Sequence, residues 1–563
     1  MKKIFRKELL EQRYLRSKSD FSQIESVEQM FNRVANFISD SELIYSSFED
    51  KLKWKDRYFE ILSTFRFLPN SPTLMNAGNE TSQLSACFVF PFKNNISDFF
   101  KLLENVARIH LGGGGTGFNF SLVKDSFNKE SELVFNSLAA IRLIDSLTSE
   151  LRPMAKRRGA NMGILNFNDK NIHDFLDLKS NPLSSSLSNF NLSVLISDED
   201  MEHIYSQFYA DSDQDLKGVE NKIFHVWKKI SHNAWSCGDP GLLFLGSINR
   251  TNPLSFLGEI TATNPCGEVP LFPFESCNLG SLNLVKYFEN GKINWELLQQ
   301  DIFTAVRFLD SVIDVNTYFF SETKEISMAN RKMGLGVMGW AHLLILLEIP
   351  YNSEEAVTLG SELMKFIHSN SLEASMDLAK ERGSFINLNK SIYYPEKILR
   401  NATVNSIAPT GSISVLAETS SSIEPLFSLA YSRFFEENTF VFKDFDPIFL
   451  KTMKQKKIWN QKLRKQVEST GSIQSSDLPI ELKRLFLTAN EIEPIWHLKH
   501  QKAFQDYTDN AVSKTINLPE STSEKEVSEI FLKAWKMGLK GITVYRNQSK
   551  AKQIIRKGFC NSC

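Results

Sequence analysis

The chain has 563 residues, of which 42% are hydrophobic and 23% charged, and these proportions exclude a chain that is disordered as a whole. Its 65 basic and 66 acidic residues leave a formal charge of −1, so no overall field draws it onto nucleic acid or an anionic membrane. Six cysteines are too few for a secreted disulfide framework, so each is considered as a reduced thiol.

Residues 1–75 predict helices. Runs such as VEQMFNRVANFI and YFEILSTFRFL place apolar residues three and four positions apart. The first fifteen residues have scattered charges and no apolar centre, unlike a secretory signal. The least polar long stretch, residues 333–347, is too short to span a bilayer. We therefore expect a soluble, cytoplasmic protein that begins with a helical layer.

Residues 76–549 predict one large α/β region. Short apolar or alternating runs such as LSACFVFPF, TGFNFSL, NMGILNF and GLLFLG are bounded by Gly, Asn and Pro. Amphipathic stretches such as DIFTAVRFLDSVIDVN separate them. Residues 550–563 are polar and basic without a core-facing period, and they predict a mobile tail.

The glycine run at residues 112–117 (GGGGTG) formally fits the GxGxxG fingerprint of a dinucleotide-binding fold. The following FNFSL alternates as a strand does, whereas the fingerprint requires a helix at this point. No Lys-Ser/Thr pair follows for a triphosphate-binding loop. We interpret the glycines as a place of close backbone approach. A nicotinamide dehydrogenase stays as a disfavoured alternative.

The run Asn264-Pro265-Cys266-Gly267-Glu268 combines an amide, a thiol and a carboxylate at alternate positions. Alternate side chains of an extended segment point the same way, so the three groups share one face. Such a face can bind and deprotonate a hydroxylated substrate beside a sulfur atom. The residues alone also allow a buried structural cysteine whose neighbours form turns.

Residues 409–412 predict a phosphate site. The strand-like ATVNSIA precedes Pro409, Thr410, Gly411 and Ser412, and an amphipathic run follows them. Unbonded backbone N–H groups and hydroxyls are then expected at a helix N-terminus. An ordinary helix N-cap is the alternative.

The segment TNPCGEVPLFPFESCNLGSLNL closely resembles the finger loop of ribonucleotide reductase catalytic subunits, particularly the adenosylcobalamin-dependent class. The resemblance extends in family order over FLPNSPTLMNAG, QLSACFVFP, HLGGGGTGFNFS, KRRGANMGIL, NATVNSIAPTGSISVLAETSSSIEPLF, DNAVSKTINLP and AWKMGLKGITVYR, from about residue 11 to 549. It implies a ten-stranded α/β barrel of two half-sheets over residues 76–549, with the finger loop at its centre.

The resemblance also implies the chemistry of this loop. Cys266 would become a thiyl radical that abstracts the 3′ hydrogen of a ribonucleotide, shielded from solvent by the barrel. Glu268 would be the base on the 3′-OH, and Asn264 would bond the ribose hydroxyls. Cys87 and Cys277, 190 positions apart, match the redox pair that supplies two electrons. By sequence alone they would be two unrelated buried thiols.

Three other cysteines lie outside this set. Cys560 and Cys563 resemble the tail pair that re-reduces the active-site disulfide and is itself reduced by thioredoxin or glutaredoxin. A zinc site is the alternative, but no second Cys-x-x-Cys or nearby His pair completes it, and no metal site is predicted. Cys237 matches no catalytic position and is expected in the core.

The matched blocks imply binding sites for a ribonucleotide substrate and for a deoxynucleotide or ATP effector. Implied substrate contacts are Ser71, Thr73, Ser85, Ala86, Gly115, Pro409, Thr410, Gly411 and Ser412. Implied effector contacts, at a homodimer interface, are Asp145, Lys156, Arg157 and Arg158. A solvated Asp and a plain basic turn are the alternatives for these.

Two departures from the family bear on regulation. The segment DSFNKESELVFNSL is shorter than the usual effector loop and lacks its glycines. The chain also begins directly with the catalytic entry helices, without an ATP-cone. We therefore expect no overall inhibition by dATP through this chain.

The radical source is expected to be adenosylcobalamin. Two-subunit relatives relay a radical through adjacent tyrosines near the chain end, whereas Tyr545 here is single within Thr-Val-Tyr-Arg. The alternative keeps ribonucleoside diphosphate reduction but takes the radical from a separate metal-containing subunit, with no cofactor in this chain. Triphosphate substrates also stay open. A catalytically silent nucleotide-binding scaffold is disfavoured because all three active-site thiols are present. We expect no nucleic-acid or membrane partner.

Overall fold

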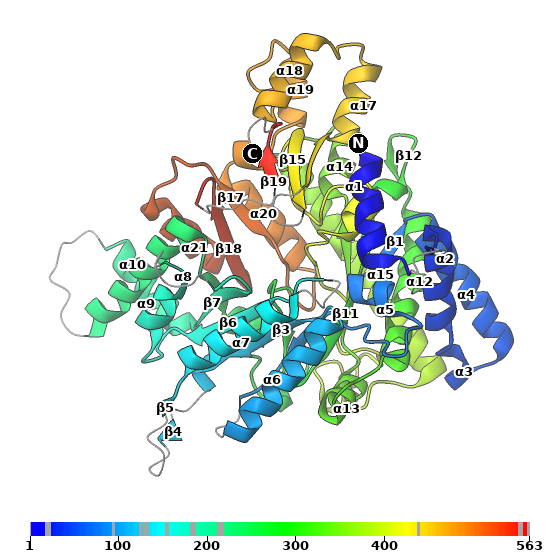
Figure 1. The fold of residues 1–563 in the computed structure, drawn as a ribbon, viewed down its shortest axis with the longest axis vertical. Helices are drawn as coiled ribbons and strands as arrows, with labels where there is room; N and C mark the ends of the chain where they lie inside the picture. Colours follow the sequence, from blue (N-terminus) through cyan, green and yellow to red (C-terminus); the bar gives the residue numbers. More distant parts are fainter. Residues whose placement is uncertain are drawn as a thin grey trace.

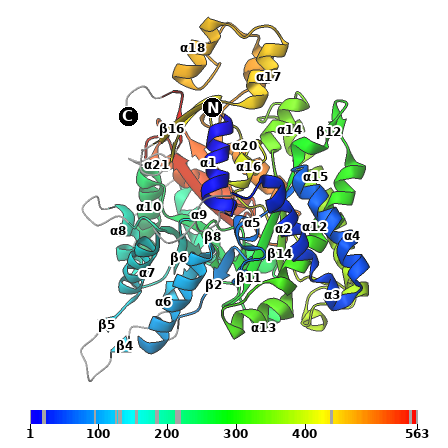
Figure 2. The same cartoon turned by 45° about the vertical axis from the view of Figure 1, so that its right-hand side comes forward.

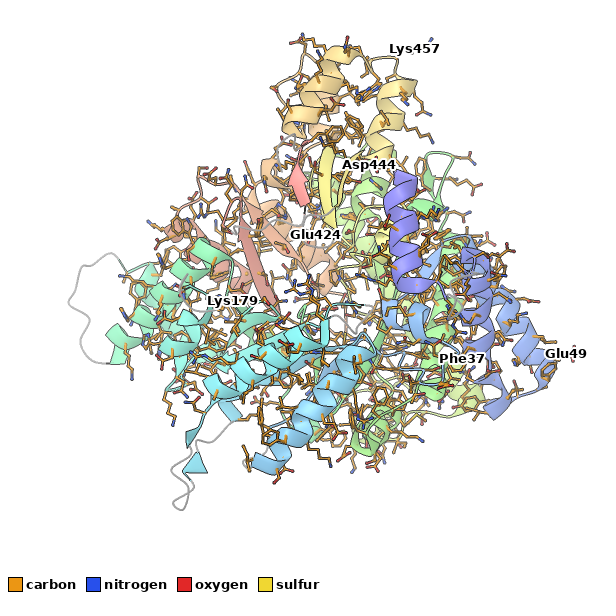
Figure 3. The ribbon with its side chains drawn as sticks, in the orientation of Figure 1. Phe37, Glu49, Lys179, Glu424, Asp444 and Lys457 are labelled. Atoms are coloured by element: carbon orange, nitrogen blue, oxygen red, sulfur yellow. The ribbon has the colours of Figure 1, made fainter. Side chains whose placement is uncertain are left out.

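The computed structural model begins with the predicted helical layer. It describes residues 2–16, 24–92, 96–122, 126–127, 134–152, 157–180, 187–210, 219–435, 440–549 and 555–559. The layer consists of α1 (Lys2–Leu9), the π-helical turn η1 (Leu10–Tyr14), α2 (Val27–Ser39), α3 (Glu42–Tyr45) and α4 (Phe48–Ser63). A capping box between Ser26 and Gln29 starts α2, whose apolar face packs on α4. Figure 1 shows these blue helices along one side of the molecule, and Figure 3 labels Phe37 on α2 and Glu49 on α4.

The main sheet carries two sets of parallel strands. Its members are β1 (Phe67–Pro69), β2 (Cys87–Val89), β3 (Gly115–Asn119), β6 (Asn161–Asn166), β7 (Phe190–Ile196), β8 (Gly241–Phe244), β11 (Ser276–Asn283), β14 (Met333–Met338), β17 (Thr515–Leu518) and β18 (Gly541–Arg546). Strands β2, β3, β6, β7 and β8 are parallel neighbours. Strands β11 and β14 are parallel, as are β17 and β18. Antiparallel pairs β2–β11 and β8–β18 join the two sets.

Residues 405–407 close this sheet into a barrel. Parallel bridges join Asn405 to Leu335 of β14 and Ile407 to Val512, just before β17. Backbone bonds continue on both sides, from Ser406 N to Leu335 O (3.2 Å) and from Ile407 N to Ala511 O (3.1 Å). Strand β11 pairs with β2 through its first residues and with β1 through residues 280–282. The predicted ten-stranded α/β barrel of two half-sheets is thereby confirmed.

Helices and short elements cover the barrel. They are α5 (Ser71–Asn76), α6 (Ile96–Leu111), α7 (Ser137–Leu151), α8 (Ile172–Ser180), α9 (Asp198–Phe208), α10 (Val219–Cys237), α11 (Leu245–Arg250), α12 (Trp295–Val315), α13 (Ser321–Asn330), α14 (Trp340–Leu346), α15 (Glu354–Arg382), α16 (Ile413–Leu416), α20 (Pro494–Gln505), α21 (Glu524–Lys536) and the strands β4 (Ser126–Phe127), β5 (Val134–Phe135), β9 (Ala262–Thr263), β10 (Pro270–Leu271), β12 (Phe288–Glu289) and β13 (Lys292–Ile293). In the described parts of the chain, no helix has the length and apolar character to cross a membrane.

A buried ionic cluster ties the helical layer to the barrel. Glu42 of α3 accepts hydrogen bonds from Arg307 of α12 and Arg382 of α15. Arg382 also donates to Asp310 of α12 at 3.0 Å, and Arg331 donates to the same carboxylate at 2.8 Å. Buried charges persist only when they are paired and hydrogen-bonded. The layer is therefore fixed against the barrel by groups from three helices.

A small sheet at one end of the barrel includes part of the predicted tail. It contains β15 (Ala430–Phe435), β16 (Phe440–Phe445) and β19 (Ile555–Lys557), beside α17 (Pro447–Gln455), α18 (Gln461–Thr470) and α19 (Ile480–Leu485), as Figures 1 and 2 show. β19 pairs antiparallel with β15, and the Phe559 ring packs edge-on against Phe445. Residues 555–557 of the predicted tail therefore form a strand, β19. Cys560 and Cys563 lie outside the described residues.

Candidate active site

The loop that carries Cys266 crosses the barrel interior. Strands β9 and β10 form an antiparallel pair on either side of it. From β7, Asn191 Nδ2 donates to Pro265 O at 2.8 Å. From the closing segment, Ser406 Oγ donates to Glu268 O at 2.9 Å. Because Asn191 and Ser406 belong to opposite half-sheets, the loop spans the space between them.

Glycines of β3 make room for this loop. A Cβ atom at Gly117 would lie 1.7 Å from Thr263 O, and one at Gly115 would lie 2.7 Å from Pro265 Cγ. The glycine run therefore serves close backbone approach, as predicted. Strand β3 begins inside the run, at Gly115, and continues to Asn119, so a strand stands where a dinucleotide fingerprint requires a helix.

Cys87 of β2 and Cys277 of β11 are direct partners in an antiparallel register. Residues opposed in this way have Cα atoms about 4.5–5.5 Å apart, inside the roughly 4.4–6.8 Å that a disulfide spans. Both thiols are buried, and burial raises the pKa of each well above its ordinary value. The charge of Glu268 raises the pKa of Cys87 further, whereas Lys332 opposes the rise at Cys277. The two thiols are placed to form a disulfide across one strand pair.

Asn264 and Glu268 occupy the base of the loop. Asn264 Nδ2 donates to Cys87 Sγ at 3.2 Å, and its Oδ1 accepts from Val269 N at 3.0 Å. Glu268 is buried, and its Oε2 has no hydrogen-bond partner among the described residues. Burial raises the pKa of Glu268 to about 7, although hydrogen bonding to Asn264 opposes this rise. A buried unpartnered carboxylate oxygen costs free energy, so this atom is suited to accept a hydrogen bond from a bound hydroxyl.

Cys266 differs from the other two thiols in its exposure. Its neighbours Pro265 and Glu268 are buried, but the Cys266 side chain is exposed. Gly267 turns the tip of the loop with φ +78°, and a Cβ there would meet nothing within 4 Å, so the tip borders open space. The thiol therefore faces open space at the loop tip, while the loop itself lies inside the barrel. Surrounding protein still raises the pKa of Cys266 to about 12, mainly by burial and then by the Glu268 charge.

The predicted phosphate loop, residues 409–412, leads into a single helical turn, α16. The sequence predicted an amphipathic run with a helix N-terminus here, and a single turn supplies little of a helix dipole. Thr410 adopts φ +52°, and its Oγ1 accepts from Ser422 N at 2.7 Å. Ser412 Oγ accepts from Arg13 Nη1 at 2.8 Å. The loop thus meets the N-terminal segment, which the sequence did not indicate.

Four further predicted substrate contacts, all buried, are Ser71, Thr73, Ser85 and Ala86. Their polar groups have partners in the protein. Thr73 Oγ1 donates to Leu84 O at 3.1 Å, and the Ser71 hydroxyl bonds the Tyr14 hydroxyl at 2.8 Å. A substrate that contacts Ser71 must share or displace the bond to Tyr14.

Two of the predicted effector residues, Asp145 of α7 and Arg158, contact the segment just before β7. Asp145 Oδ1 accepts from Asn189 N at 2.9 Å, so this carboxylate is bonded to the backbone rather than simply solvated. Arg158 Nη2 donates to Ser188 O at 2.7 Å. Both residues therefore meet the same short segment. Lys156 lies outside the described residues.

Arg157 belongs to the predicted effector loop but also acts on the active site. Its Nη1 donates to Gly113 O at 3.0 Å, which places it beside the glycine run. The positive charge of Arg157 lowers the pKa of both Glu268 and Cys266, against the larger effect of burial. Sequence spacing gave no sign of this electrostatic link.

Two remaining sequence predictions concern thiols and metals. Cys237 is only half-buried at the end of α10, where its Sγ contacts Asn233 O at 3.2 Å, so it is not a core residue. In the portion of the chain that the structure describes, no three His, Cys, Asp or Glu side chains form a group that could hold a metal ion.

Comparisons with known proteins agree with this geometry. Residues 5–82 match a family model described as "Ribonucleotide reductase, all-alpha domain", and residues 85–398 and 395–545 match "Ribonucleotide reductase, barrel domain". A "Vitamin B12-dependent ribonucleoside-diphosphate reductase" of Thermoplasma acidophilum is 40% identical, over 94% of this chain and 71% of the relative. A protein of the same name from Mycobacterium tuberculosis is 38% identical, over 97% and 80%. The "Actinobacillus ureae class Id ribonucleotide reductase alpha subunit" has a similar fold, with a TM-score of 0.78, 21% identity and 97% of each chain covered.

Proposed function

The chain belongs to the ribonucleotide reductase family, and we propose that it reduces ribonucleoside diphosphates to 2′-deoxyribonucleotides with a radical on Cys266 that originates from adenosylcobalamin. The observation that carries the proposal is the direct opposition of Cys87 and Cys277, with Asn264 of the Cys266 loop bonded to Cys87. The names of the relatives from T. acidophilum and M. tuberculosis support both the diphosphate substrate and the cofactor.

In the proposed reaction Cys266 and Glu268 each act twice, and Glu268 finally returns its proton to the 3′ oxygen. The Cys266 thiyl takes the 3′ hydrogen, and Glu268 takes the 3′-OH proton. The 2′-OH then leaves as water after it receives a proton from the thiol pair. Cys87 and Cys277 supply two electrons and two protons in all and end as a disulfide, and Cys266 returns the hydrogen to the 3′ carbon. The balance is one ribonucleotide and one dithiol to one deoxyribonucleotide, one disulfide and water.

Glu268 has the properties that this role needs. A general base works best when its pKa lies near the working pH, and burial raises the pKa of Glu268 to about 7. Its unpartnered Oε2 leaves room for a hydroxyl to donate to it. Asn264 is held by its bonds to Cys87 and Val269. It can therefore orient the Cys87 thiol as well as contact the ribose.

Adenosylcobalamin, when bound, supplies the first unpaired electron by homolysis of its carbon–cobalt bond. The exposed thiol of Cys266 and the open space at Gly267 fit a large group that acts beside the loop tip. Tyr545 in β18 stands between Val544 and Arg546, without the adjacent tyrosine of a radical relay. Both observations support a radical source that works in place rather than through a partner subunit.

The proposal includes a homodimer, an effector site and a protein reductant. Helices α6 and α7 contact each other, and they expose the apolar side chains Ile96, Phe100, Leu111 and Leu143. Such a surface suits a subunit interface beside the effector residue Asp145 on α7. Thioredoxin or glutaredoxin would reduce Cys560 and Cys563, which would in turn reduce the inner disulfide.

Anaerobic incubation of the purified protein with adenosylcobalamin, a dithiol, CDP and a deoxynucleotide effector tests this function. The expected result is dCDP without any second protein. The matched control is Cys237→Ser, which should retain activity, whereas Cys266→Ser should abolish it. Formation of dCDP only after a metal-containing subunit is added would establish the alternative radical source. An absence of dCDP under both conditions would contradict ribonucleotide reduction.

A further inference from the structure

Two consecutive residues of the N-terminal segment contact both predicted substrate-binding loops. Arg13 Nη1 donates to Ser412 Oγ at 2.8 Å, and the Tyr14 hydroxyl bonds Ser71 Oγ at 2.8 Å. Tyr14 is fully buried, whereas Arg13 is half-buried. The turn η1 therefore anchors through Tyr14 and presents a guanidinium to the phosphate loop.

Contacts other than the bond to Ser412 also hold this segment in place. Arg6 of α1 pairs with Glu418 at 3.6 Å and lies over the Phe65 ring at 5.0 Å. Helix α1 also contacts β16, and Figure 3 shows Asp444 of β16 beside it. Arg13 is thus held near the loop by the packing of its neighbours, so its own side chain can change partners.

The phosphate loop offers an incomplete set of polar contacts. Gly411 is exposed, and a Cβ there would meet nothing within 4 Å. Thr410 is buried, with its Oγ1 turned to Ser422 N. Ser422 is also fully buried, yet its Oγ has no partner among the described residues. The buried hydroxyls of Thr410 and Ser422 therefore lie on the inner side of the loop, Gly411 is open on its outer side, and Arg13 contacts Ser412.

We propose that Arg13 recognises the terminal phosphate of the substrate and so selects nucleoside diphosphates over monophosphates. This inference rests on the proposed function. Ser412, Thr410 and Ser422 supply neutral contacts, whereas a diphosphate carries several negative charges. A guanidinium provides a fixed fork of donors that matches a phosphate, and such charge-assisted bonds are the stronger ones. Arg13 contacts Ser412, next to the exposed Gly411. It is therefore placed to bind the terminal phosphate, which lies farther out than the first.

A structural role for Arg13 makes a different prediction from a recognition role. If its bond to Ser412 only anchors the N-terminal segment, its loss disturbs the loop for every nucleotide alike. If Arg13 binds the terminal phosphate, its loss weakens the binding of CDP and leaves the binding of CMP unchanged. Arg13→Gln removes the charge, and Arg13→Lys keeps the charge without the fork. Lys7→Gln is a matched control, because Lys7 is an exposed cation on the same segment.

Calorimetric titration of the purified protein with CDP and CMP, at saturating deoxynucleotide effector and without cobalamin, distinguishes these roles. We expect Arg13→Gln to weaken CDP binding about tenfold to a hundredfold, with CMP binding changed less than twofold. Arg13→Lys should fall between wild type and Arg13→Gln, and Lys7→Gln should bind CDP as wild type does. In turnover, KM for CDP should rise while kcat stays within about twofold.

Equal weakening of CDP and CMP, or unchanged CDP binding in Arg13→Gln, would overturn the inference. Thermal unfolding of each variant identifies a folding defect, and Arg13→Lys serves as the readout if Arg13→Gln unfolds. Turnover of CDP by the wild-type protein is measured in the same preparation. It reports on the proposed function independently, so failure of the two hypotheses can be told apart.

Discussion

Cys87 and Cys277 occupy directly opposed positions on β2 and β11, although 190 positions separate them in the chain. Their opposition brings the two Cα atoms into the range of separations that a disulfide spans. It also explains why Asn264 can contact the pair from the loop that carries Cys266. The account of the active site depends on this arrangement.

The first prediction concerns this pair. In prereduced protein that carries Cys560→Ser and Cys563→Ser, without external reductant, one turnover should oxidise Cys87 and Cys277 to a disulfide, because they supply the two electrons and no tail pair re-reduces them. Peptide mass spectrometry should then find these two cysteines linked. Cys87→Ser should lose at least about a hundredfold in dCDP formation with dithiol, and Cys237→Ser should not. Linkage of Cys237 to either inner thiol would contradict the assignment.

The second prediction concerns pH and Glu268. Its pKa of about 7 exceeds its ordinary value of 4.5 because burial disfavours the charged form. The base acts when deprotonated, so kcat should rise with pH and level off above about 7. Glu268→Gln should lower kcat by roughly 10²–10⁴ and remove this rise. A variant that keeps the same pH profile would exclude Glu268 as its source.

The same pKa change affects stability with the opposite sign. The folded protein binds the Glu268 proton more tightly than the unfolded chain, so the free energy of unfolding falls as pH rises from about 4.5 to 7. Above pH 7 the free energy of unfolding is lower than at pH 4 by on the order of 3 kcal/mol because of this group. Glu268→Gln should therefore be more stable than wild type at pH 8 but not at pH 4, as denaturant unfolding can show.

The third prediction concerns the space between β3 and the loop. Gly117→Ala should displace the Cys266 loop, because the new Cβ would lie 1.7 Å from Thr263 O. We expect loss of dCDP formation with the barrel still folded by circular dichroism. Gly163→Ala on neighbouring β6, whose Cβ would lie 3.1 Å from a Phe190 ring carbon, is the control and should keep most activity. Full activity in Gly117→Ala would show that the loop does not need this approach.

The fourth prediction concerns Lys332 and Glu275, a buried ion pair with a 2.6 Å separation close to Cys277. Lys332→Met leaves the Glu275 charge unpaired and should destabilise the protein by about 3–5 kcal/mol. The double variant with Glu275→Gln should recover part of that loss in thermal unfolding. Lys332 lowers the pKa of Cys277 and Glu275 raises it. Lys332→Met should therefore re-reduce its disulfide more slowly than wild type, and the double variant should be slowed less. An unchanged rate of disulfide re-reduction would show that the ion pair does not influence the redox step.

Much of the fold could be predicted from the sequence. Amphipathic spacing indicated the helices before residue 67, and short apolar runs indicated most barrel strands. The ten-strand ring and the meeting of Cys87 with Cys277 followed only from the family resemblance. Periodicity cannot supply such contacts, because they depend on which strands pair across hundreds of residues.

Other features could not be predicted because they depend on tertiary partners. β19 forms because its backbone finds β15, while its own sequence is polar. Asp145 is bonded because the chain brings Asn189 beside it. Cys266 is exposed because Gly267 turns the loop tip into open space, which no local pattern records. Arg13 meets Ser412 from the other end of the chain.

The central claim is that Cys266 removes hydrogen from the 3′ carbon of the sugar, and isotope substitution tests it most directly. Turnover of CDP deuterated at the 3′ carbon should be slower than that of unlabelled CDP, whereas deuterium at the 1′ carbon should have no such effect. Cys266→Ser should form no dCDP from any of the three substrates. The claim would be contradicted if CDP with and without 3′ deuterium were reduced at equal rates and the Cys266→Ser variant still formed dCDP.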